Sequence, residues 1–191
     1  MFKYCPACAS EKISFIGGKS FRCPGCGFVY YHNVAAATGC VIAVPENDNS
    51  NGPHSGPQRL LLLVRGKDPA KGKLDLPGGF VNPGEGAIEG LYREMQEEIG
   101  WVPPVPPGLP LTDVFTLFAS FSNVYPYKNI DYNTCDLYFS LCAPGLTEKD
   151  LRLRSGEIDG VRFLKPEEID YEEIAFESTR RALKAYLHLK K

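Results

Sequence analysis

Three glutamates that fall within five consecutive positions are the residues of this chain best suited to chemistry. In a helix, at about 100° per residue, Glu94, Glu97 and Glu98 project from one face and their carboxylates converge. Like charges at these spacings destabilise a helix, and near its carboxyl end they also meet the negative end of the helix dipole. Carboxylate oxygens are preferred ligands of hard divalent cations, so a bound metal would offset the repulsion. The alternative is a solvated acidic face on a surface helix.

The sequence before these glutamates favours the metal site. Gly78 and Gly79 carry no Cβ, so the backbone can approach a ligand closely and a main-chain carbonyl can join the carboxylates around a cation. Glu85 and Arg93 have opposite charges, and we expect an ion pair between them that pins the loop to the helix. These features together predict a divalent-cation site rather than an acidic surface.

The spacing of these residues resembles the Nudix box, G-x5-E-x7-R-E-u-x-E-E-x-G-u. Every glycine and charged position matches, from Gly79 through Glu85 to Gly100, and the one departure is Trp101, where an aliphatic residue is commoner. The resemblance implies an α+β fold, the Nudix α/β/α sandwich with a mixed β-sheet. It also implies Mg²⁺- or Mn²⁺-dependent hydrolysis of the pyrophosphate bond in a nucleoside diphosphate linked to another moiety.

The same resemblance implies roles for individual residues. Glu98 and a carbonyl of Gly78 or Gly79 correspond to the most constant ligands of the catalytic metal. Arg93 belongs to the catalytic set, but Arg93 and Glu85 are mainly structural, and Glu85 can reach an additional metal. The implied metal ligands are Gly78, Gly79, Glu85, Glu94, Glu97 and Glu98.

A candidate general base lies outside the box. In enzymes of this family the base often lies on a loop before the last strand, and Glu157 occupies that place here. The resemblance therefore implies that Glu157 is the base or an extra metal ligand, with Asp159 as a second candidate. The alternative is a surface carboxylate of the loop.

Four of the seven cysteines form two close pairs, Cys5-x2-Cys8 and Cys23-x2-Cys26. This spacing is typical of a structural Zn²⁺ site, in which four thiolates leave no position for water. Disulfides and incidental thiols are the alternatives, which the expected reducing compartment disfavours. We therefore predict a zinc ribbon over residues 1–32 and a Nudix hydrolase domain over residues 33–191.

A zinc ribbon ahead of a Nudix domain resembles the NADH pyrophosphatases and the related ADP-ribose or nucleotide-sugar hydrolases. NADH pyrophosphatases carry a Ser-Gln-Pro-Trp-Pro-Phe-Pro type of segment after the box, whereas residues 120–127 here read Ser-Phe-Ser-Asn-Val-Tyr-Pro-Tyr. ADP-ribose or a nucleotide sugar is therefore expected ahead of NADH or an NAD-capped RNA end. The candidate substrate-binding residues are Arg65, Asn123, Tyr125 and Tyr127, where tyrosine rings stack on a base or ribose. Packing of an aromatic loop on the domain or on a partner subunit is the alternative.

The remaining elements must hold these residues in place. A helix is expected over 86–99, ended by Gly100 and the prolines that follow it. A C-terminal helix is expected over 176–188, and a mobile polar loop over 45–58. Strands are expected at 35–44, 59–64 and 160–164, and at 111–121 and 131–141, the last two joined by an aromatic loop.

Composition limits the partners. A net charge of −2 and a pI near 6.0 give no global attraction for nucleic acid or anionic membranes. The longest apolar run is far below the roughly 20 residues of a membrane span, and no signal pattern precedes it, so we expect a cytoplasmic protein. The expected partner is a small-molecule nucleotide, and a homodimer is a family-level expectation. The competing class is a catalytically silent nucleotide-sensing or nucleic-acid-binding module, which the intact carboxylate set disfavours.

Overall fold

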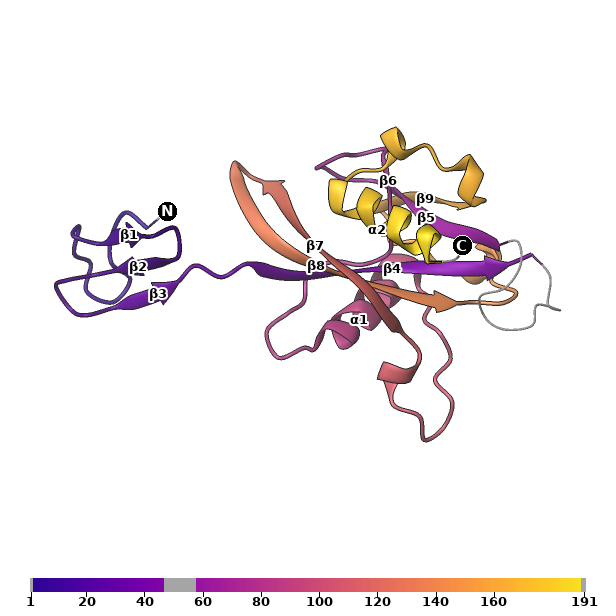
Figure 1. Ribbon diagram of the computed structural model, residues 1–191, viewed down its shortest axis with the longest axis horizontal. Coiled ribbons are helices and arrows are strands. Elements are labelled where there is room, and N and C mark those ends of the chain that lie inside the picture. Colours follow the sequence, from indigo (N-terminus) through magenta and orange to yellow (C-terminus); the bar gives the residue numbers. More distant parts are fainter. Residues whose placement is uncertain (1, 47–57, 190–191) are drawn as a thin grey trace. The chain divides into compact units, whose positions relative to one another are not determined.

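The computed structural model describes residues 2–46 and 58–189. The chain divides into two compact units, Met1–Val34 and Ala35–Lys191, which can be followed along the sequence in Figure 1. Most of the loop predicted at 45–58, namely residues 47–57, lies outside the described part of the chain.

The first unit is a small antiparallel sheet with almost no apolar core. Its strands are β1 (Ser14–Ile16), β2 (Ser20–Arg22) and β3 (Val29–Tyr31), in that order. A Gly-Gly turn at residues 17–18, with φ of 60° and 66°, connects the first two strands. Apart from cysteines, Phe21 is the one buried apolar side chain among the described residues of this unit. A unit of this size needs a cross-link in addition to its core.

The second unit is built on a mixed six-stranded sheet. Its order is β6-β5-β4-β8-β7, and β9 also pairs with β5. β4 and β8 run parallel, and the other pairs are antiparallel. The strands are β4 (Ala35–Pro45), β5 (Gln58–Arg65), β6 (Leu74–Asp75), β7 (Thr116–Tyr127), β8 (Ile130–Cys142) and β9 (Ile158–Leu164).

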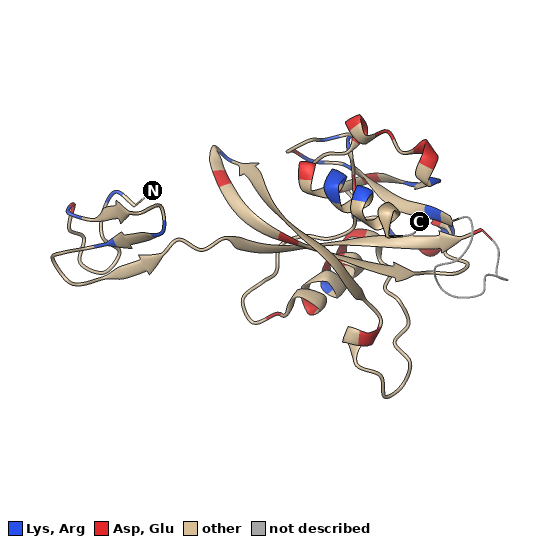
Figure 2. Ribbon diagram, in the orientation of Figure 1, with Lys and Arg blue, Asp and Glu red and all other residues tan. Residues whose placement is uncertain are grey.

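Two helices, α1 (Ala87–Ile99) and α2 (Glu177–His188), cover opposite faces of this sheet (Figure 1). Successive residues of β4 and β5 face different helices, so both faces of these strands need apolar side chains. The middle of each strand accordingly carries no charged residue (Figure 2). The expected α/β/α sandwich is confirmed. One layer combines Leu91, Met95 and Ile99 with Cys40, Ile42, Leu61 and Leu63, and the other combines Ala182, Leu183 and Tyr186 with Val41, Ala43, Leu60 and Leu62.

The predicted bounds of α1 are confirmed to within one residue. Gly86 is the N-cap, and its amide donates to the Glu89 carboxylate (2.7 Å). Gly100 ends the helix in the left-handed conformation, with φ of 60°. Short 3-10 turns complete the described helices at Leu111–Asp113, Glu148–Asp150, Pro166–Glu168 and Tyr171–Glu173.

The prediction of an aromatic loop between residues 121 and 131 is wrong, because this segment forms the end of a long β-hairpin. β7 extends to Tyr127 and β8 begins at Ile130, so only Lys128 and Asn129 connect them. Both connecting residues have positive φ (47° and 63°), and such two-residue turns match the twist of the flanking strands. The strand expected from residue 111 begins later, at Thr116, after a 3-10 turn.

No helix in the described ranges is long and apolar enough to cross a membrane.

Candidate functional site

The backbone of residues 77–81 lies along the first half of β4 and fixes the two glycines before α1. The amides of Thr38 and Cys40 donate to the carbonyls of Gly79 (2.8 Å) and Pro77 (2.9 Å). The Gly78 carbonyl lies between these two and accepts no hydrogen bond from any described residue. Of the two carbonyls that the sequence offers as a metal ligand, that of Gly78 is therefore the available one.

Close packing explains why both positions are glycine. Gly78 has φ of 147°, and a Cβ there would overlap the Thr38 carbonyl oxygen. A Cβ on Gly79 would lie 2.6 Å from Cδ of Glu94. The Gly78 amide donates to Oε2 of Glu98 (2.9 Å). The glycine pair thus lets two carboxylates of α1 approach the backbone.

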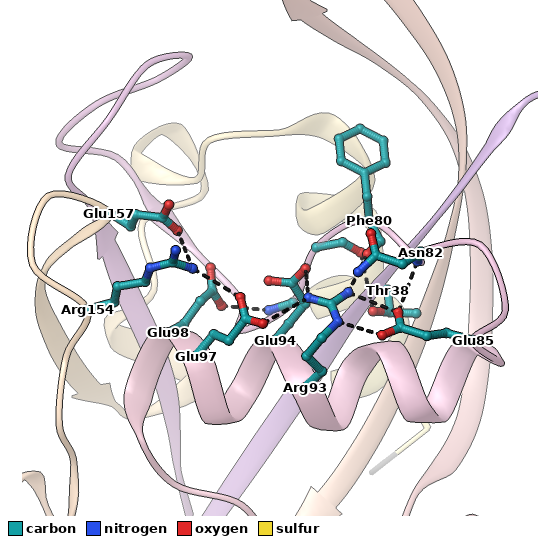
Figure 3. Close-up of polar contacts among 12 residues, drawn as sticks. Thr38, Phe80, Asn82, Glu85, Arg93, Glu94, Glu97, Glu98, Arg154 and Glu157 are labelled. Carbon is teal, nitrogen blue, oxygen red and sulfur yellow. Dashed lines mark hydrogen bonds and ion pairs between the residues drawn. The ribbon is translucent and has the colours of Figure 1, made fainter.

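A pocket of about 240 Å³ opens where α1 meets this backbone. Glu94 and Glu98 line it together with Gly78 and Gly79, and Glu157 reaches it from the segment just before β9. In Figure 3 the Glu94 and Glu98 side chains rise from one side of α1, and Glu157 comes from a separate segment. The pocket therefore gathers the glycines, two of the three helix glutamates and the candidate base.

Glu98 is a partly buried carboxylate beside another negative charge. Burial and the charge of Glu94 together raise the pKa of its carboxyl to about 8, despite the hydrogen bond from the Gly78 amide. A divalent cation would remove both penalties. Two carboxylates and a carbonyl are hard oxygen donors, so the residues present fit Mg²⁺ or Mn²⁺.

Glu97 does not line the pocket, although the sequence groups it with Glu94 and Glu98. Its carboxylate is exposed and forms ion pairs with Arg154 (3.0 Å) and Arg93 (3.5 Å), as Figure 3 shows. A shared helix face predicts that all three carboxylates converge, but in this conformation only those of Glu94 and Glu98 reach the pocket.

The expected ion pair between Glu85 and Arg93 is confirmed. Nε and Nη2 of Arg93 donate to the two Glu85 oxygens at 2.7 and 3.0 Å, and the Asn82 amide donates to the same carboxylate (3.0 Å). These hydrogen bonds lower the pKa of Glu85 to about 2. Arg93 also donates to Glu94 (2.7 Å). Glu85 lies outside the pocket lining, so the geometry places it and Arg93 as a brace for the loop and for Glu94.

Glu157 is held on both sides by basic residues. Its carboxylate lies 2.7 Å from Lys67 Nζ and 3.7 Å from Arg154 Nη1. The amide of Gly66 donates to its carbonyl (2.7 Å), which fixes the backbone before β9. Asp159, the second candidate, is exposed and does not line the pocket.

Three of the four candidate substrate residues line the pocket. Asn123 and Tyr125 reach it from alternate positions of β7, and Arg65 reaches it from the end of β5. Tyr127 continues the alternation but is exposed and lies beyond the pocket, with Lys128 Nζ 5.2 Å from its ring centre. The tyrosines belong to a strand rather than to a loop, so their direction is fixed by the pleat.

Several pocket residues were missed by sequence reasoning. β8 contributes Thr134, Asp136 and Tyr138, which alternate along one face. The period-2 pattern of polar residues in an otherwise apolar strand was the available signal. Others come from places without a local signal: Lys67, Asp75, Phe176 and Thr179.

The four sulfurs of the first unit form a compact cluster. All lie within 4.8 Å of one another, and among the described residues this is the one group of three or more such ligand atoms at that spacing. Although burial raises the pKa of Cys23, backbone amides of Cys26 and Gly25 lower it to about 7, which favours the thiolate. The cluster, made of Cys5, Cys8, Cys23 and Cys26, can hold a metal ion.

Comparison with known proteins bears on the second unit. The family model described as NUDIX domain matches residues 40–186. A curated relative, the NAD-capped RNA hydrolase NudC of Deinococcus radiodurans, is 34% identical over 98 residues, which is 51% of this chain and 32% of the relative. The ADP-ribose pyrophosphatase of Methanocaldococcus jannaschii is 38% identical over 77 residues, which is 40% of this chain and 38% of the relative. The matched region thus spans about a third of these two relatives.

Solved structures share the architecture. The crystal structure of a NUDIX hydrolase from Nitrosomonas europaea has a TM-score of 0.61 and 25% identity, covering 98% of this chain and 91% of that one. The NUDIX domain of Shewanella oneidensis NrtR, solved in complex with ADP ribose, has a TM-score of 0.60 and 15% identity, covering 83% of this chain and 90% of that one. The second of these establishes likeness of fold alone.

Proposed function

The chain belongs to the NUDIX domain family, whose model matches residues 40–186, and on this premise we propose that it is a metal-dependent pyrophosphohydrolase. The proposed substrate is a nucleoside diphosphate linked to a second moiety, with ADP-ribose or a nucleotide sugar preferred. The observation that carries the proposal is the approach of Glu98 to Gly78 and of Glu94 to Gly79 within one pocket. A nucleotide-sensing module without catalysis would have little need for two carboxylates so close together.

Glu94, Glu98 and the Gly78 carbonyl are the residues proposed to hold Mg²⁺ or Mn²⁺, the ions that NUDIX proteins generally use. When bound, such an ion neutralises pyrophosphate oxygens and lowers the pKa of a coordinated water. Arg93 keeps Glu94 in place through its 2.7 Å hydrogen bond. Glu97 lies outside the pocket lining, and its proposed role is to position the Arg154 guanidinium through their ion pair.

Glu157 is the proposed general base. It lines the same pocket as the two ligand glutamates, and Lys67 and Arg154 restrict the direction of its carboxylate. In this role Glu157 takes one proton from the attacking water, and the pyrophosphate bond breaks to leave a nucleotide and a phosphorylated second moiety. Lys67 is the proposed contact for a phosphate oxygen, because it is a positively charged side chain on the pocket wall.

A second candidate substrate is NADH or an NAD-capped RNA end. The relative from Deinococcus radiodurans is named for NAD-capped RNA hydrolysis, which makes an RNA end a candidate partner. The first unit exposes Phe2, Tyr30 and Tyr31 and also carries Lys3, Lys12 and Lys19, a combination that suits stacking on unpaired bases. ADP-ribose remains the preferred candidate substrate, because the chain lacks the aromatic-proline segment typical of NADH pyrophosphatases.

Zn²⁺ is the ion proposed for the four-cysteine cluster, with a structural role. Four thiolates would complete a tetrahedral site and leave no position for a reacting water.

The test is turnover of purified protein with Mg²⁺ or Mn²⁺ over ADP-ribose, NADH, FAD, ADP-glucose and NAD-capped RNA. The expected result is metal-dependent cleavage with the highest kcat/KM for ADP-ribose or ADP-glucose. Glu98→Gln is expected to lower kcat by about 10³-fold, whereas Glu89→Gln, an exposed change on the same helix that can preserve the cap, is expected to leave turnover unchanged. Cleavage of none of these compounds by folded protein would sink the proposal.

A further inference from the structure

A chain of buried polar side chains lies on the α2 side of the pocket. The Tyr138 hydroxyl donates to Ser178 Oγ (2.9 Å), and Ser178 Oγ donates to Oδ2 of Asp136 (2.7 Å). These residues belong to β8 and to the first turn of α2, which lie 40 or more positions apart in the sequence. The carboxylate of Asp136 is thereby fixed through one of its two oxygens.

The other oxygen of this carboxylate has no hydrogen-bond partner. Asp136 is 7% exposed and Ser178 is 1% exposed, yet Oδ1 of Asp136 is buried without a donor among the described residues. A buried acceptor without a partner costs free energy, so proteins seldom keep one that has no use. Asp136 also lines the pocket, so a molecule bound there can supply the missing donor.

The missing partner is a hydrogen-bond donor of the bound molecule. The Ser178 hydroxyl already donates to Oδ2 of Asp136, so Oδ1 is the oxygen left to accept a hydrogen bond. An N–H or an O–H group of the ligand can supply it.

Flat apolar surfaces line the same pocket as this acceptor. Tyr125 and Phe176 line the same pocket, and their ring centres are 5.6 Å apart. The Arg65 guanidinium lies 4.9 Å from the Phe176 ring centre and so steadies that ring. Aromatic surfaces next to one buried acceptor suit a planar heterocycle that carries an amino group.

We propose that Asp136 is a specificity-determining residue whose Oδ1 accepts a hydrogen bond from the exocyclic amino group of the substrate's base, with adenine as the expected base. Tyr125 and Phe176 provide the surface on which the ring lies. The inference rests on the proposed function in naming the base of that substrate, and it adds a contact on β8 that no feature of the Nudix box specifies. The same N–H₂ chemistry exists in the carboxamide of nicotinamide, so the test separates the two.

The experiment is calorimetric titration of the full chain with mononucleotides, which contain no pyrophosphate bond and need no catalysis. AMP is compared with purine riboside 5′-monophosphate, which lacks only the amino group, and nicotinamide mononucleotide with nicotinic acid mononucleotide. The wild type is expected to bind AMP at least about 10-fold more tightly than purine riboside 5′-monophosphate. A preference confined to nicotinamide over nicotinic acid would overturn the adenine assignment and place nicotinamide at Asp136.

Three variants show whether Asp136 is responsible. Asp136→Val keeps a strand-compatible side chain without an acceptor and is expected to bring the two purine ligands to within about 3-fold of each other. Asp136→Asn keeps one acceptor oxygen and is expected to retain part of the preference. Asp131→Asn, an exposed change on the same strand, is the matched control and should bind as the wild type does.

Two results would overturn the inference: equal binding of the two purine ligands by the wild type, or an unchanged preference in Asp136→Val. Because mononucleotide binding is measured without turnover, a failure of the proposed hydrolysis leaves this test intact. Conversely, active enzyme with no amino-group preference would remove the Asp136 assignment alone.

Discussion

The two units of this chain bind their proposed metals in opposite ways. In the first unit the four sulfurs come from two short local turns, and a metal on them is proposed to hold together a sheet in which Phe21 is the one buried apolar side chain besides cysteines among the described residues. In the second unit the ligands come from a helix and a backbone segment that a two-sided apolar core has already placed. The first site substitutes for a core, and the second depends on one.

This difference between the two metal sites predicts that one metal controls the stability of the first unit and the other controls the activity of the second. Removing metal from the first unit should remove its fold, whereas removing metal from the second should leave the fold and stop the chemistry. Trp101, the single tryptophan, packs on the core of the second unit and reports on that unit alone. Trp101 fluorescence therefore separates unfolding of the second unit from loss of metal in the first.

The largest effect is expected for Cys5→Ser, which removes a buried ligand of the four-cysteine cluster. Metal binding of this type contributes on the order of 10 kcal/mol to the folding of small zinc units. The amide signals of residues 2–34 should lose their NMR dispersion while Trp101 fluorescence stays native. Cys135→Ser, which lies outside the cluster, is the control and should retain the metal. A loss of the Trp101 signal in Cys5→Ser would mean that the units are not independent.

Glu98→Gln is expected to lower kcat by about 10³-fold, because removing a ligand charge weakens electrostatic stabilisation of the transition state. The change keeps the side-chain volume and removes a carboxylate that burial disfavours, so the second unit should be no less stable. Steady-state kinetics with Mg²⁺ and a thermal melt followed at Trp101 check the two statements. Full turnover in this variant would remove Glu98 from the metal site.

Leu183→Ala should destabilise the second unit by about 2–5 kcal/mol, because it leaves a cavity in the layer beneath α2. Denaturant unfolding followed at Trp101 measures the loss. Zinc content of the first unit should not change, since its ligands do not depend on this core. Leu189→Ala, at an exposed position, is the control and should shift the midpoint little.

The smallest effect is expected at the brace between Glu85 and Arg93. Glu85 has a pKa of about 2 in the folded protein, below its ordinary value of 4.5, so its stabilising effect is present above pH 4.5 and is lost as the pH falls toward 2. Glu85→Gln should therefore lower the melting temperature of the second unit at pH 6 by a few degrees. The gap between variant and wild type should close on acidification, and a gap that persists at pH 2 would contradict the ion-pair explanation.

Local features were predictable from the sequence because their signals are local. The bounds of α1 follow from Gly86 and Gly100, and the pairing of Glu85 with Arg93 follows from charge and spacing. The hairpin that carries Tyr125 was not recognised, because two connecting residues without glycine give a weak turn signal.

The sequence by itself determined the family resemblance, the carboxylate helix and the four-cysteine spacing, since each depends on residues within one continuous segment of the chain. Only the tertiary structure decided that Glu97 faces Arg154 outside the pocket, and that Asp136, which lines the pocket, accepts a hydrogen bond from Ser178 of α2. The reason is physical: side-chain direction on one element follows from its period, but the partner across the sheet is set by strand pairing and helix packing between distant segments.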